Sequence, residues 1–113
     1  MMLEGIFGNK TAEKVLLHVF HYGEIYPSAI AQDYDLALDP IKRQLERFES
    51  AGVLVAKQLG RSRVFSFNLK SPYTKPIKDL IQITYQAIPL REREELFAQR
   101  RRPRRKDKPV SRK

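Results

Sequence analysis

The sequence predicts a mostly α-helical α+β domain with one small β-hairpin, in the order helix, helix, helix, hairpin, helix. Two observations lead to this prediction. Apolar residues recur at three- and four-residue spacing in three segments before residue 52 and in one after residue 72. Between these segments lie two short runs of β-branched and aromatic residues, separated by a turn that contains glycine. A chain of 113 residues fits a single domain.

The first two helices are expected at residues 11–22 and 27–34. Asn9 or Thr11 can cap the first helix, and its apolar side chains form one stripe: Ala12, Val15, Leu16, Val19 and Phe20. Pro27 suits the first position of the second helix because its ring fixes a helical φ angle. We expect this helix to turn three side chains inward: Ile30, Ala31 and Tyr34.

The third helix is expected from Asp39, or slightly earlier, to residue 51. Asp39 is a good N-cap, Pro40 a good first helical residue, and Gly52 a good C-terminal stop. Apolar residues at spacings of four and three predict its inward face: Ile41, Leu45 and Phe48.

A hairpin and a further helix follow. Residues 53–58 and 63–68 predict two strands joined by a turn over residues 59–62, with three alternating side chains expected on one face: Phe65, Phe67 and Leu69. Helical spacing then returns in an apolar stripe: Tyr73, Ile77, Leu80, Ile81, Thr84, Tyr85 and Ile88. We therefore place one domain at residues 1–89, and a possible short helix at residues 90–99.

The charge is concentrated in a basic tail, residues 100–113. This tail carries a net charge of +8 out of +9 for the whole chain, so residues 1–99 are nearly neutral. Clustered Lys and Arg neutralise phosphates, which makes the tail a candidate nucleic-acid arm, and a solubilising segment is the alternative. The candidate arm residues are Arg100, Arg101, Arg102, Arg104, Arg105, Lys106 and Lys108.

The composition argues against several classes of protein. The chain has no cysteine, which fits a cytoplasmic protein, and no apolar run of the roughly 18 residues that a membrane span needs. It has no glycine-rich phosphate loop and no nucleophile elbow, so we expect neither an enzyme nor a cofactor. His18 and His21 have a spacing that can hold a metal, but we expect none, since His18 lies off the apolar stripe and His21 suits the helix end.

A resemblance to a known family rests on two stretches. Residues 30–54, IAQDYDLALDPIKRQLERFESAGVL, carry an apolar-Ala pair, an apolar residue in the turn, the four-and-three spacing and an Ala-Gly-apolar signature. The hairpin residues 60–65, GRSRVF, follow. In this order they resemble winged helix-turn-helix transcriptional regulators of the ArsR-like and MarR-like groups, over roughly residues 10–88.

The resemblance implies a regulator that binds double-stranded DNA. The third helix would be the recognition helix in the major groove, with candidate contacts from Asp39, Lys42, Arg43, Gln44 and Arg47. The wing would contact the DNA backbone or minor groove through Arg61, Ser62 and Arg63. The helix of residues 73–88 matches the dimerisation helix of ArsR-like proteins, although its stripe can also close the core of its own chain. The expected protein is a nucleoid-associated cytoplasmic homodimer.

Some features depart from this family pattern. Ala37 stands near the position where the family has a small polar cap, which is why the third helix is expected to start later. Four carboxylates are expected on or beside the DNA face, where they would repel phosphates: Asp33, Asp35, Asp39 and Glu46. The alternatives are a winged-helix module for protein interaction, with the tail alone binding nucleic acid, and an RNA-associated protein.

Overall fold

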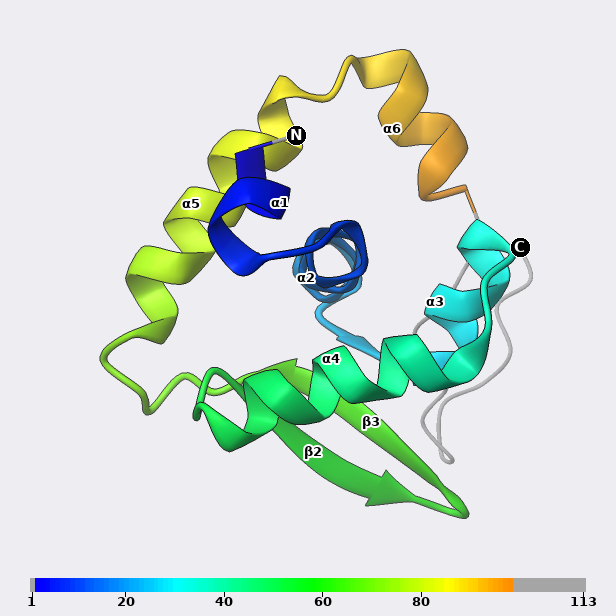
Figure 1. The fold of residues 1–113 in the computed structure, drawn as a ribbon, viewed down its shortest axis with the longest axis vertical. Coiled ribbons are helices and arrows are strands. Elements are labelled where there is room, and N and C mark those ends of the chain that lie inside the picture. The colour runs from blue at the N-terminus through cyan, green and yellow to red at the C-terminus, as the bar shows by residue number, and fades with distance from the viewer. Residues whose placement is uncertain (1, 99–113) are drawn as a thin grey trace, which may run out of the picture.

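The computed structural model describes residues 2–98, and these form an α+β fold, as predicted (Figure 1). The elements are α1 (Met2–Phe7), α2 (Lys10–Tyr22), β1 (Glu24–Ile25), α3 (Pro27–Tyr34), α4 (Leu38–Ser50), β2 (Leu54–Leu59), β3 (Ser62–Phe67), α5 (Thr74–Ala87) and α6 (Leu90–Leu96). In this part of the chain, every helix is too short or too polar to cross a membrane.

Helix α2 is the centre of the core, and it contacts α1, α3, α4, α5 and the sheet (Figure 1). Its apolar stripe is fully buried at Val15, Leu16 and Val19. The Asn9 side chain caps it by accepting the backbone N–H of Ala12 at 2.7 Å. The predicted helix and one of its two candidate caps are therefore confirmed.

Helices α3 and α4 are joined by a connection of three residues, 35–37. Asp35 takes the left-handed conformation (φ 54°, ψ 50°), which Asp tolerates better than most residues. The prediction that Asp39 caps α4 and that Pro40 is its first residue is wrong, because the helix begins at Leu38. Pro40 costs nothing there, since the first N–H groups of a helix have no partner within it. Asp39 instead lies in the first turn, where the helix dipole stabilises a carboxylate.

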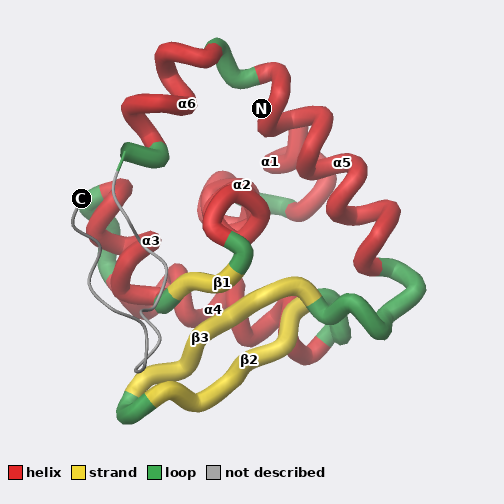
Figure 2. The backbone as a smooth tube through the Cα atoms, turned by 180° about the vertical axis from the view of Figure 1, so that it is seen from behind, coloured by secondary structure: helices red, strands yellow, loops and turns green. Residues whose placement is uncertain are grey.

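The sheet has three antiparallel strands in the order β1-β3-β2 (Figure 2). Leu59 pairs with Ser62 across a two-residue loop, in which Gly60 has a positive φ of 61° that glycine adopts without strain. Phe65 and Phe67 are buried as predicted, but Leu69 is 80% exposed because β3 has already ended.

Helix α5 lays most of its predicted stripe on the core of its own chain. Ile81, Thr84 and Ile88 are buried, and three others are partly buried against the core: Ile77, Leu80 and Tyr85. Tyr73 precedes the helix and is 69% exposed. On the outer side of α5, Ile83 is exposed. Most of the apolar stripe therefore closes the core of its own chain, which was the alternative given beside dimerisation.

Two elements were not predicted. Helix α1 has only six residues, one of them a glycine, and it is fixed by the fully buried Leu3. Strand β1 has two residues and pairs with the far edge of β3. Both are too short to show a period in the sequence.

Candidate nucleic-acid interface

Helix α4 presents a charged outer face because its apolar face is packed inward. Ile41, Leu45 and Phe48 are buried, and the positions between them point away from the core. The exposed charged side chains on this face are Asp39, Lys42, Arg43, Glu46 and Arg47. The amphipathic spacing of the helix therefore determines which of the predicted contact residues are accessible.

A groove of about 390 Å³ runs between α4 and the β2–β3 hairpin. It brings together Lys42 from the helix and three residues from the hairpin tip, Arg61, Ser62 and Arg63. Other residues lining the groove are Tyr26, Pro27, Ser28, Leu38, Glu46, Gln58 and Phe65. Of the residues predicted for the recognition helix, Lys42 alone lines this groove, together with all three residues predicted for the wing.

The basic residues of α4 and of the hairpin tip differ in what they contact. The Arg63 guanidinium donates to the Glu49 carboxylate at 2.6 Å and lies over the Phe65 ring, so it ties the hairpin to α4. The Arg47 guanidinium donates to the Phe7 carbonyl at 2.9 Å. By contrast, three side chains have no hydrogen bond or ion pair with any residue of the range 2–98, which leaves them open to an external anion: Lys42, Arg43 and Arg61.

Two other residues, Gln44 and Asp33, are not exposed beside α4 as predicted. Gln44 is half-buried, and its Oε1 atom is enclosed with no hydrogen-bond partner among the described residues. Asp33, expected beside the DNA face, is instead paired with His18 in the interior, so it does not repel phosphates there. The candidate arm residues of the basic tail lie outside the described residues.

His18 is fully buried, contrary to the expectation that it points away from the core. Its Nε2 lies 3.0 Å from Oδ2 of Asp33 on α3. Its Nδ1 lies 3.1 Å from the Lys14 carbonyl oxygen and 3.3 Å from the Tyr34 hydroxyl. Around it stands an aromatic cluster: Tyr22, Tyr34 and Phe97 contact its ring, and His21 stacks on Phe97.

Burial lowers the pKa of His18 from 6.5 to about 4, although the neighbouring Asp33 carboxylate opposes this shift. The imidazole is therefore neutral at pH 7. A neutral ring donates through one nitrogen only: when Nε2–H donates to Asp33, Nδ1 accepts from the Tyr34 hydroxyl, and its approach to the Lys14 carbonyl oxygen is then a contact between two acceptors. Burial also raises the pKa of Tyr34, which keeps this donor protonated. The chain Tyr34–His18–Asp33 locks α3 onto α2.

The sequence contained only a weak signal for this chain of polar groups. His18 and Asp33 are 15 residues apart and on different helices, so no local spacing relates them. Within residues 2–98, no three His, Cys, Asp or Glu side chains are grouped so that they could hold a metal ion.

No family model matches this chain, and no curated protein matches it significantly.

Proposed function

We propose that this protein is a winged helix-turn-helix regulator that binds double-stranded DNA. The main support is the groove lined by Lys42 of α4 and Arg61 of the hairpin tip, neither of which forms a hydrogen bond or ion pair with residues 2–98. Unpaired cations on two elements of one surface suit a polyanion with regularly spaced phosphates. The resemblance of residues 30–54 to ArsR-like and MarR-like regulators supports the same proposal.

The element order supports this proposal as well. Helices α3 and α4 are consecutive and joined by a three-residue turn, as in a helix-turn-helix motif, and a two-stranded hairpin follows directly. In the proposed complex α4 enters the major groove. Arg43 reads a guanine edge there, while Lys42 and Arg61 bind phosphates.

The charge distribution indicates that the folded domain and the basic tail contribute differently to DNA binding. Glu46 lines the groove and Asp39 is exposed on the same helix, so phosphates meet both signs of charge. Residues 1–99 are nearly neutral in sum. We therefore assign base preference to α4 and the hairpin, and most of the salt-dependent affinity to the basic tail.

A matched set of variants tests the proposal. The full chain is used to enrich duplexes from a random pool, and affinity is then measured for an enriched and a scrambled duplex. Arg43→Ala is expected to reduce the preference about tenfold, because a bidentate guanine contact is worth about 1–3 kcal/mol. Arg61→Ala is expected to weaken both duplexes alike and to lower the salt slope by about one.

The control is Arg91→Ala on α6, which removes the same charge from an exposed position away from the hairpin (Figure 1). It should leave both affinities nearly unchanged. If no duplex is enriched, or if Arg91→Ala has the same effect as Arg43→Ala, the proposal is wrong.

A protein-interaction module is the second candidate, and exposed apolar residues favour it. Leu36 in the connection before α4 and Leu38 at the start of α4 are both exposed, and Leu38 lines the groove together with Tyr26. Apolar side chains and the Glu46 carboxylate in this groove offer a peptide contacts that a phosphate backbone would not use. In the same assay this alternative predicts no enriched duplex for the folded domain.

A further inference from the structure

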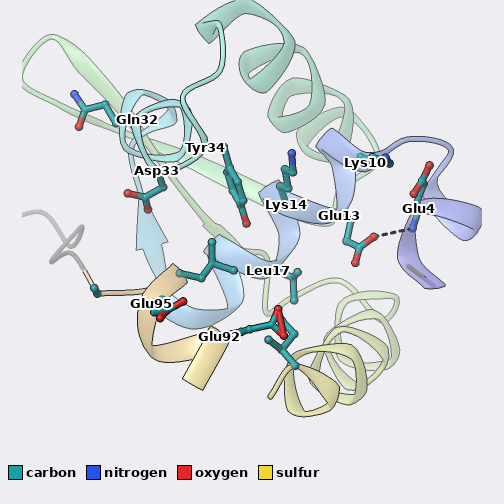
Figure 3. Close-up of a pocket in the computed structure, with 13 residues that line it drawn as sticks. Glu4, Lys10, Glu13, Lys14, Leu17, Gln32, Asp33, Tyr34, Glu92 and Glu95 are labelled. Atoms are coloured by element: carbon teal, nitrogen blue, oxygen red, sulfur yellow. Dashed lines mark hydrogen bonds between the residues drawn. The ribbon is translucent and has the colours of Figure 1, made fainter. Parts of the chain in front are cut away.

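A second and larger pocket, of about 790 Å³, lies on a different part of the molecule, between α1, α2, α3 and α6 (Figure 3). Its walls carry apolar side chains from three elements: Leu17, Ile88 and Leu96. Five carboxylates and two ammonium groups line it, namely those of Glu4, Glu13, Asp33, Glu92 and Glu95 against Lys10 and Lys14, and of these carboxylates Asp33 is already paired with His18. An apolar pocket with excess carboxylates suits an organic cation.

Glu13 provides the observation that points to a ligand. The residue is only 4% exposed, and its Oε1 accepts the Glu4 backbone N–H at 3.1 Å. Its Oε2 is enclosed and has no hydrogen-bond partner among the described residues. A buried acceptor without a donor is costly, and a bound ammonium group would remove that cost. Burial also raises the pKa of Glu13, although the hydrogen bond from Glu4 and nearby positive charges, that of Lys14 among them, oppose the shift.

Carboxylates stand on two walls of the pocket. Glu13 comes from α2, whereas Glu92 and Glu95 come from α6, and Leu17 lies between them (Figure 3). Glu92 and Glu95 are exposed and form no ion pair within residues 2–98. Neither lysine forms an ion pair with these carboxylates within residues 2–98, and Lys14 lies over the Tyr34 ring, 4.7 Å from its centroid.

We propose that this pocket binds an aliphatic diamine or polyamine. One ammonium group donates to the Glu13 carboxylate, the methylene chain lies along Leu17, Ile88 and Leu96, and the second ammonium group pairs with Glu92 or Glu95. Because the pocket contains none of the groove residues Lys42, Arg61, Ser62 and Arg63, this proposal stands independently of DNA binding.

Calorimetry on the full chain without DNA tests this, with three probes of equal length: cadaverine, pentylamine and pentanediol. Cadaverine is expected to bind most tightly, pentylamine more weakly, and pentanediol not measurably. Glu13→Gln should weaken cadaverine about tenfold or more, since a charge-assisted hydrogen bond is worth that much. The double variant Glu92→Gln, Glu95→Gln should bring the affinity for cadaverine close to that for pentylamine.

Matched controls make the result unambiguous. Glu46→Gln removes an exposed carboxylate from the other groove and should leave cadaverine binding unchanged. The double variant alters only exposed side chains, so it remains informative even if Glu13→Gln disturbs folding. The proposal is overturned if cadaverine does not bind, if pentanediol binds equally well, or if the double variant binds cadaverine like the unmodified chain.

Discussion

Arg43 and Arg47 lie one turn apart on α4 and are both exposed, but only Arg47 bonds to the rest of the described fold. Its guanidinium holds the Phe7 carbonyl at the end of α1 and lies over the Phe48 ring. We therefore expect Arg47→Ala to lower the free energy of unfolding by about 0.5–1.5 kcal/mol, as for a single hydrogen bond. Arg43→Ala should leave it unchanged. Urea unfolding of both variants checks this, and equal losses would contradict it.

His18 predicts a specific dependence of stability on pH. In the unfolded chain its pKa is near 6.5, whereas burial lowers the folded value to about 4. The unfolded state thus binds the proton first, and stability falls as pH drops through this range, by at most about 1.4 kcal/mol per pH unit. Denaturant unfolding at about pH 7.5 and about pH 5.5 should show this loss, and His18→Gln should reduce it.

Comparing the unmodified chain with His18→Gln isolates the contribution of His18, because every other titratable group is present in both proteins. His21→Gln serves as the matched control. Equal pH slopes for the unmodified chain and for His18→Gln would contradict the assignment of a neutral buried imidazole.

Residue-level accessibility is what the sequence predicted least well. The spacing of Ile41, Leu45 and Phe48 correctly placed Lys42 and Arg43 on the outer face of α4. It did not indicate that Gln44 would be half-buried or that Asp33 would be paired with His18. Such pairings depend on how α3 packs on α2, which no pattern within one helix contains.

At the scale of elements, the connection between α3 and α4 depends on one left-handed residue. Asp35 has φ 54° and ends α3 with its backbone N–H bonded to α3 carbonyls. Asp35→Gly should retain the stability of the protein or increase it. Asp35→Val should lower the free energy of unfolding by about 1–2 kcal/mol, because a branched Cβ crowds the backbone there. Thermal unfolding measures both, and equal stabilities would show that the turn is not strained.

Elements with a clear period were predictable, and the possible short helix at residues 90–99 is observed as α6, whereas the shorter α1 and β1 were not predicted. Helix α3 has the predicted bounds, and the hairpin turn was found from Gly60 and its flanking strands. The N-cap of α4 was misplaced by two residues, at Asp39 instead of Ala37, because Asp39 and Pro40 also suit the first turn of a helix that has already begun. Helix α1 and strand β1 owe their conformation to contacts with α2 and β3.

At the scale of the whole molecule, the proposed homodimer needs a different surface from the predicted one. Since most of the α5 stripe packs on the chain's own core, an interface on α5 would use its outer side, where Ile83 is exposed. Light scattering should then give about twice the 13.2 kDa mass of the chain. Ile83→Glu should give the monomer, while Gln82→Glu should not. A monomeric mass for the unmodified chain would contradict dimerisation.

We propose that the folded domain, and not only the basic tail, recognises a DNA sequence. The most direct test measures the salt dependence of binding to an enriched and a scrambled duplex, for the full chain and for a truncation after residue 98. The truncation is expected to keep its preference for the enriched duplex, with lower affinity and a smaller salt slope, because the tail's phosphate contacts are lost. A truncation that binds both duplexes equally would contradict the claim.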